Sequence, residues 1–139
     1  MVHSFPTRRS SDIDEAGRAY VGSQAREGGI IVRIDPDDTT TVVADDLDFP
    51  NGMVITPDRT TLIVAESVGR RLTAFTIGAD GSLSDCRIFA DGLDGPPDGI
   101  ALDAEGGVWT SMTLAHQLDR KSTRLNSSHT IQSRMPSSA

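Results

Sequence analysis

Two short motifs contain the residues of this chain that are best suited to hold a divalent cation. Residues 50–53 (Pro-Asn-Gly-Met) recur as residues 97–100 (Pro-Asp-Gly-Ile), which places Asn51 and Asp98 at equivalent positions 47 residues apart. Amide and carboxylate oxygens are ligands that hard divalent cations prefer. Proline restricts the backbone before each of these residues, and the glycine after it permits close packing or a positive φ. We therefore predict both as metal ligands; the alternative is that both motifs are ordinary turns.

Short β-rich runs surround both motifs. They are separated by turn signals rich in Gly, Pro and Asp, and none shows the long apolar period of an amphipathic helix. The sequence therefore predicts an all-β protein with strands at residues 19–21, 29–34, 40–44, 52–55, 61–65, 71–77, 85–89, 99–102 and 108–112.

An internal repeat narrows the fold class. Residues 14–21 recur as residues 103–110, 89 positions later. This is a second repeat, in addition to the 47-residue spacing of the two motifs. A four-stranded β-propeller blade takes roughly 40–50 residues, and a closed ring needs about four to eight blades. We predict a partial β-propeller of about two blades, in which Asn51 and Asp98 converge on the central channel. A small sandwich or barrel would explain the strands but not the repeat.

The two ends of the chain differ from its middle. Residues 3–12 and 119–139 are rich in Ser and Arg and resemble one reading frame of common sequencing adapters. We therefore expect residues 1–12 and 119–139 to be adapter-derived, disordered tails around a propeller segment at residues 13–118. The alternative is that they are ordinary tails of the protein.

Composition excludes several classes of protein. The 139 residues carry a formal net charge of −7, which argues against nucleic acid as a partner because a phosphate backbone requires a basic surface. No apolar run is long enough to span a bilayer. The single cysteine excludes a disulfide framework and a cysteine-based zinc site. We expect a small-molecule partner, with no membrane partner and the cytoplasm as the compartment.

Several blocks of the sequence resemble a known family. Residues 49–53, 56–58, 62–66, 80–90 and 97–109 follow, in order and spacing, the pattern of the senescence-marker-protein and gluconolactonase family, also called regucalcin-like. The resemblance implies a six-bladed propeller with one divalent metal, calcium or zinc, in its channel. It implies that a Glu, two Asn-type residues and an Asp hold this metal, and that sugar lactones or related lactones are hydrolysed.

The resemblance also assigns roles to individual residues. Asn51 falls on a metal-ligand Asn, and Asp98 falls on the metal-ligand Asp, which is also the suspected general base. The second Asn is expected just before Asp14, and the Glu in a preceding blade, so the chain as written is expected to be inactive. The alternative is a non-catalytic or metal-free propeller that binds a ligand, of the strictosidine-synthase-like or NHL type.

Other residues with reactive side chains receive structural interpretations. Glu66 is expected at a solvated strand end, and Cys86 is expected to be an unreactive thiol on an outer strand. Tyr20 and Trp109 occupy equivalent strand positions, which favours packing between blades over ligand stacking. His116 has no second ligand at metal-binding spacing.

Overall fold

Over its described residues the chain folds into three four-stranded antiparallel sheets, each a meander in which every strand pairs with the next. The computed structural model describes residues 11–113, 117–122 and 129–132. The first sheet contains β1 (Ser11–Ile13), β2 (Ala19–Gly22), β3 (Gly29–Ile34) and β4 (Thr40–Leu47). The middle sheet contains β5 (Pro50–Ile55), β6 (Thr61–Glu66), β7 (Arg71–Ile77) and β8 (Leu83–Ala90). The last sheet contains β9 (Pro97–Leu102), β10 (Val108–Met112), β11 (Gln117–Lys121) and β12 (His129–Gln132).

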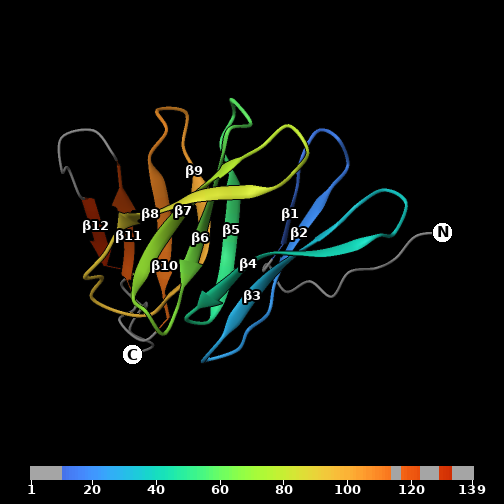
Figure 1. Ribbon diagram of the computed structural model, residues 1–139. Helices are drawn as coiled ribbons and strands as arrows, with labels where there is room; N and C mark the ends of the chain where they lie inside the picture. Colours follow the sequence, from blue (N-terminus) through green and yellow to red (C-terminus); the bar gives the residue numbers. More distant parts are fainter. Residues whose placement is uncertain (1–10, 114–116, 123–128, 133–139) are drawn as a thin grey trace, which may run out of the picture.

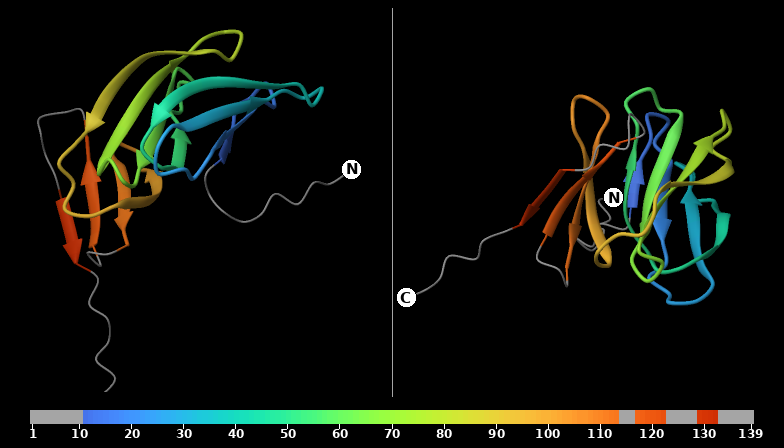
Figure 2. Two further views of the ribbon diagram at one scale, coloured as in Figure 1. Left: turned by 60° about the horizontal axis from the view of Figure 1, so that its bottom comes forward. Right: turned by 90° about the vertical axis from the view of Figure 1, so that its left-hand side faces the viewer.

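The sheets lie side by side as blades (Figures 1 and 2). Their first strands are neighbours, because β5 contacts both β1 and β9, whereas β4 and β8 lie at the outside of their sheets. This arrangement confirms the partial β-propeller that the repeat predicted. Three sheets are present rather than about two because β1, β11 and β12, which the sequence pattern did not predict, pair with the neighbouring strands.

Both faces of the middle sheet are buried at β6, which explains the continuous apolar run in that strand. Leu62 packs in one hydrophobic cluster with Tyr20 of the first sheet. Ile63, the next residue along the strand, packs in a second cluster with Val108 of the last sheet. Since successive side chains of a strand point to opposite faces, a strand covered on both sides requires apolar residues at every position.

Equivalent turns confirm the 89-residue repeat as a structural one. Asp14 Oδ1 accepts hydrogen bonds from the amides two and four residues later, at 2.9 and 3.0 Å. Asp103 Oδ1 accepts the corresponding bonds, both at 2.9 Å. Each carboxylate therefore closes the turn between the first two strands of its sheet.

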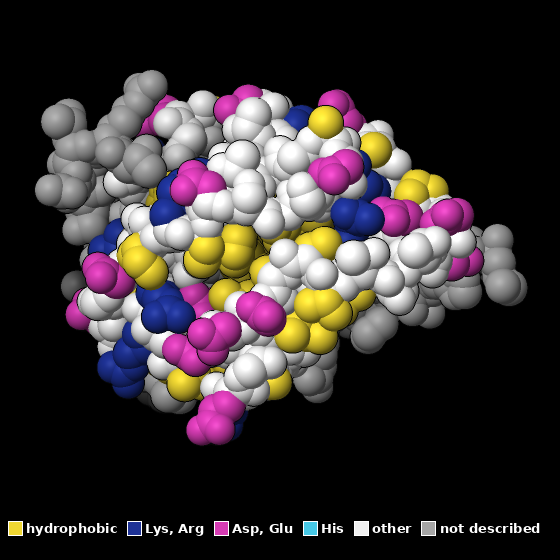
Figure 3. Space-filling model, viewed as in Figure 1, with side chains coloured by type: hydrophobic (Ala, Val, Ile, Leu, Met, Phe, Trp, Pro, Cys, Tyr) yellow, Lys and Arg dark blue, Asp and Glu magenta, His cyan; other side chains and the backbone are white. Residues whose placement is uncertain are grey.

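The outer strands form the surface drawn in Figure 3, where hydrophobic side chains gather between charged ones across the middle of the face. Val42 of β4 is 57% exposed and Ile88 of β8 is 52% exposed. Cys86 is exposed on β8, as expected for an outer-strand thiol.

The expected tail boundaries fall within strands. Residues 11 and 12 belong to β1, and residues 119–121 belong to β11, in which Asp119 pairs with Thr110 of β10. Residues 1–10, 123–128 and 133–139 of the expected tails lie outside the described residues, whereas residues 129–132 form β12 rather than a disordered tail. In the described part of the chain, no helix is long and apolar enough to cross a membrane.

Candidate functional site

Asn51 and Asp98 lie at matching irregularities in two inner strands. The pairing register shifts between Pro50 and Met53 in β5, and also along the stretch of β9 that follows Pro97. Such bulges change the direction of a side chain and occur often beside functional sites. The alternative that both motifs are turns is wrong, because both belong to strands.

Gly52 allows the two inner strands to approach closely. A Cβ atom at this position would lie 2.4 Å from the Asp98 carbonyl oxygen and 2.9 Å from the Ile100 nitrogen. Any side chain would therefore overlap the backbone of β9. The glycine of the first motif brings its own strand against the second motif, so that Asn51 and Asp98 occupy adjoining segments.

A chain of hydrogen bonds also links the two motifs. The Asn51 Nδ2 group donates to Ser67 Oγ at 3.3 Å, and Ser67 Oγ donates to the Pro97 carbonyl oxygen at 2.5 Å. Gln24 Nε2 donates to Asn51 Oδ1 at 3.4 Å. The Asn51 amide oxygen has two lone pairs and accepts one hydrogen bond, from Gln24, so that one lone pair remains for a further ligand.

Asp98 is the less constrained of the two predicted ligands. Its side chain is half-buried, and within the described ranges it has no hydrogen-bond or ion-pair partner. A partly desolvated carboxylate without a partner is suited to bind a cation or to accept a proton.

Glu66 is buried and structural rather than solvated, which corrects the expectation from its place at a strand end. Its side chain is fully buried at the end of β6. Its Oε1 accepts the Asp48 amide at 2.7 Å, and its Oε2 accepts Arg71 Nε at 2.7 Å and the Thr73 hydroxyl. These bonds fix the segment that leads into the Asn51 motif.

The charge of Glu66 is stabilised by its partners. Burial alone would raise the pKa of this carboxyl, but hydrogen bonds from Arg71, Thr73 and the Asp48 amide lower the pKa below its ordinary value of 4.5. The same ion pair raises the pKa of Arg71. The pair is therefore ionised at neutral pH.

Two cavities adjoin the motifs. One, of about 460 Å³, lies along the inner strands and is lined by Gly52, Gly99 and Ser111 among others. The other, of about 390 Å³, is lined in part by Ser67 and Pro96. Asn51 adjoins both cavities, through its neighbour Gly52 and through its hydrogen bond to Ser67, whereas Asp98 adjoins the first cavity through its neighbour Gly99.

The fit of these residues to a metal ion follows from their donor atoms. Asn51 and Asp98 present two oxygen donors, the type that calcium prefers. Among the residues with described positions, no three His, Cys, Asp or Glu side chains gather as a metal-binding group. The pair therefore fits part of the coordination shell of a hard cation, which takes about six to eight oxygens in the case of calcium.

The two aromatic residues at equivalent positions differ in their surroundings. Tyr20 is fully buried and its hydroxyl donates to the Gly81 carbonyl oxygen of the middle sheet at 3.0 Å, which confirms packing between blades. Trp109 is half-buried and donates to Asp103 Oδ2 at 3.1 Å, and it lines the larger cavity. Trp109 therefore forms a hydrogen bond and lines a cavity, which the expectation of packing between blades did not include. His116 lies outside the described residues.

Ser67 and Gln24 are hydrogen-bonded to the predicted ligand Asn51, and the sequence pattern did not indicate either of them. Ser67 follows the end of β6 and Gln24 follows the end of β2. Their contacts with Asn51 join residues 16 and 27 positions apart. Their place after a strand end was the only available sequence signal, and it is shared by many polar residues.

The fold and the paired motifs define a class: a β-propeller segment with oxygen donors at the start of its inner strands. The family model described as "SMP-30/Gluconolactonase/LRE-like region" matches residues 7–138, a range that extends beyond residues 13–118 at both ends. The chain belongs to this family.

Individual relatives agree with the family. Pentonolactonase XacC of Haloferax volcanii is 32% identical over 112 residues, covering 76% of this chain and 38% of the relative. The 6-deoxy-6-sulfogluconolactonase of Pseudomonas putida is 30% identical over 106 residues, covering 71% of this chain and 36% of the relative. A solved luciferin-regenerating enzyme has a TM-score of 0.78 at 20% identity, covering 88% of this chain and 45% of that structure, which shows a shared fold. The chain thus spans less than half the length of these proteins.

Proposed function

We propose that this chain is part of a metal-dependent sugar-lactone hydrolase of the gluconolactonase type. The observation that carries the proposal is the close contact of the two inner strands at Gly52, beside which Asn51 and Asp98 supply oxygen donors. Two relatives named as lactonases, at 32% and 30% identity, support a lactone as the substrate.

In this proposal Asp98 is the general base. Its carboxylate accepts a proton from a water molecule while the water oxygen forms a bond to the lactone carbonyl carbon. The bond from that carbon to the ring oxygen then breaks, and the ring oxygen takes up a proton to give a hydroxy acid. Asn51 orients the site through its amide oxygen, which accepts Gln24 Nε2 and keeps a second lone pair.

Asn51 and Asp98 are also the residues that would hold a divalent cation, calcium or zinc. When bound, such an ion supplies Lewis acidity at the lactone carbonyl. We propose that the remaining ligands lie outside this chain, so that the chain as written binds metal weakly and does not turn over substrate. The cytoplasm remains our expected compartment.

We further propose that residues 1–12 and 119–139 derive from sequencing adapter, around a propeller segment at residues 13–118. The nucleotides that encode these residues test this directly. Adapter codons support the proposal, and other codons continuous with the genomic sequence contradict it.

The lactonase proposal is tested in the product of the complete gene. With glucono-1,5-lactone in a pH-stat assay, we expect hydrolysis that requires added divalent metal and falls by about 100-fold or more in Asp98→Ala. Asp45→Ala, an exposed carboxylate on β4, is the matched control and should retain the rate. A full rate in Asp98→Ala with metal still bound would refute the base assignment. Absence of metal-dependent hydrolysis would favour the ligand-binding propeller.

A further inference from the structure

Two arginines line the smaller cavity beside the paired motifs. This cavity, of about 390 Å³, is lined by Arg26 and Arg70 together with Phe49, Val68 and Thr113 among others. Arg26 lies in the connection between β2 and β3, and Arg70 lies in the corresponding connection of the next sheet, between β6 and β7. The two guanidinium groups therefore come from equivalent places on neighbouring sheets.

Neither arginine has a protein partner in the described part of the chain. Both side chains are exposed and make no hydrogen bond or ion pair there; Arg70 accepts the Leu93 amide only through its backbone carbonyl oxygen. Apart from Arg59, every other basic side chain with a described position forms an ion pair with a carboxylate. In a chain with a net charge of −7, unpaired guanidinium groups lining one cavity supply a local site for an anion.

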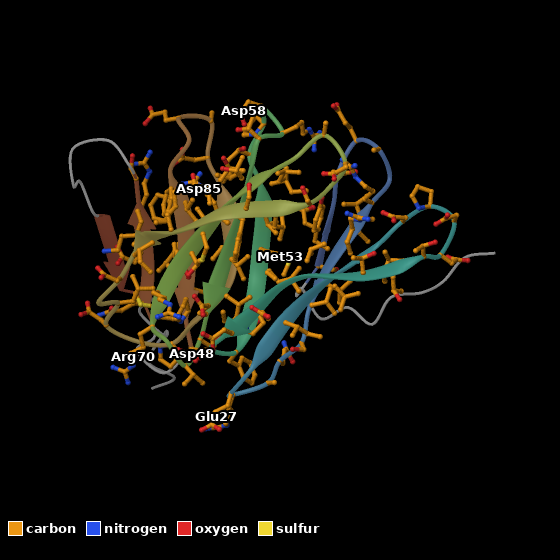
Figure 4. All side chains as sticks on the ribbon, in the orientation of Figure 1. Glu27, Asp48, Met53, Asp58, Arg70 and Asp85 are labelled. Atoms are coloured by element: carbon orange, nitrogen blue, oxygen red, sulfur yellow. The ribbon has the colours of Figure 1, made fainter. Side chains whose placement is uncertain are left out.

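Arg59 provides a comparison at the other end of the sheets. Arg70 and Asp48 lie at one end of the molecule in Figure 4, whereas Asp58, the neighbour of Arg59, lies at the opposite end. Arg59 and Arg70 are both exposed and both have a positive φ, of 64° and 50°. They differ in that Arg70 lines the cavity.

We propose that this cavity binds the phosphate, or a similar tetrahedral anion, of a substituted sugar ligand. A guanidinium group donates two parallel hydrogen bonds to such an anion, and two guanidinium groups suit an anion with three terminal oxygens. Phe49 and Val68 supply an apolar wall for the carbon skeleton. Ser67 lines the same cavity and is hydrogen-bonded to Asn51, so a ligand held here extends toward the paired motifs.

This inference rests on the proposed function only for the idea that the ligand carries a lactone ring. Anion binding itself is measured without turnover, so a failure of lactonase activity and a failure of this site are distinguishable. If the site exists, the substrates of the enzyme include sugar lactones with an anionic substituent.

The experiment is an NMR titration of the ¹⁵N-labelled 139-residue chain with glucose 6-phosphate, which is stable in water. We expect saturable shifts of the amides of Ser67, Val68 and Thr113, and none with glucose. Arg26→Gln and Arg70→Gln should each weaken binding by about tenfold, because each removes a charged hydrogen-bond donor. Arg59→Gln should bind as the parent does. Because none of these side chains has a described partner, the variants should keep the parent spectrum elsewhere.

Each other outcome overturns the proposal. Equal shifts with glucose would mean that hydroxyl groups, not the anion, are recognised. Equal affinity for inorganic phosphate would mean that the sugar contributes nothing, and equal affinity for gluconate would identify a carboxylate site for the hydrolysis product. Equal loss in Arg59→Gln would identify a general charge effect rather than a site, and the absence of saturable shifts would exclude the site altogether.

Discussion

Glu66 fixes the segment before Asn51 through bonds to three neighbouring residues. Its carboxylate accepts hydrogen bonds from the Asp48 amide, the Thr73 hydroxyl, and the Nε and Nη2 groups of Arg71. The adjacent residue, Ser67, then joins Asn51 to the Pro97 carbonyl oxygen. A buried carboxylate and a serine hydroxyl thus position the site without being proposed to touch the substrate.

Replacement of Glu66 by Gln should lower the free energy of unfolding by about 2–4 kcal/mol at pH 7, because Arg71 and Thr73 lose a charged acceptor. The pKa of Glu66 lies below its ordinary value of 4.5 in the folded protein. Its stabilising contribution is therefore present above the unfolded pKa and is lost as the pH falls through the folded pKa. The difference between variant and parent should accordingly shrink in acid.

Urea denaturation at pH 7 and in acid measures this difference. Glu27→Gln, which changes an exposed carboxylate (Figure 4), is the control and should have little effect. An effect of Glu66→Gln that stays constant between neutral and acid pH would contradict the role of its charge.

The strands show how much of the fold the sequence pattern could predict. The nine predicted runs correspond to β2 to β10, and those at residues 29–34, 71–77 and 108–112 have the observed bounds. Apart from the largely exposed outer strands β4 and β8, these strands carry β-branched and apolar residues because a neighbouring sheet covers them. β1, β11 and β12 are short or polar in sequence. Such short or polar runs lack the apolar and β-branched pattern by which a strand is recognised in a sequence.

The two proposed ligands were indicated by the repeat. Asn51 and Asp98 were chosen as candidates because their motifs repeat in register with the blades. Ser67 was not found because its contacts join residues 16 and 30 positions apart, the second of them in the last sheet, and no repeat marks them. Glu66 was misinterpreted because burial at a strand end depends on the neighbouring segment that covers it.

The contact between β5 and β9 can be tested at Gly52. Gly52→Ala should lower the free energy of unfolding by about 1–3 kcal/mol, because its Cβ would lie 2.4 Å from the Asp98 carbonyl oxygen. Gly99→Ala is the matched control, since the nearest atom to its Cβ would be Ser111 Oγ at 3.6 Å. Urea midpoints that are equal for the two variants would contradict the close approach.

At the scale of the whole molecule, the middle sheet joins two hydrophobic clusters. Leu62 belongs to the cluster shared with the first sheet, and Ile63 belongs to the cluster shared with the last sheet. The single Tyr and the single Trp of the chain lie in different sheets, Tyr20 in the first and Trp109 in the last. Their fluorescence therefore reports on the two outer sheets separately.

Leu62→Ala should destabilise the protein by about 2–5 kcal/mol, because a fully buried leucine leaves a cavity. If the sheets unfold as one unit, the transitions reported by Tyr20 and Trp109 should shift together. Val42→Ala, at a side chain that is 57% exposed, should shift neither. A shift confined to Tyr20 would show that the first sheet unfolds independently.

The central claim is that the two repeated motifs form one cation-binding site, and paramagnetic line broadening by Mn²⁺ tests it most directly. Mn²⁺ prefers oxygen ligands, and broadening detects weak binding in the 139-residue chain without turnover. We predict that the amide signals of Gly52 and Gly99 broaden at a lower Mn²⁺ concentration than the amide signals of the acidic turn at residues 35–38. Asp98→Ala should remove this difference, and the control variant Asp45→Ala should retain it. Broadening that begins in the acidic turn and is unchanged by Asp98→Ala would contradict the account.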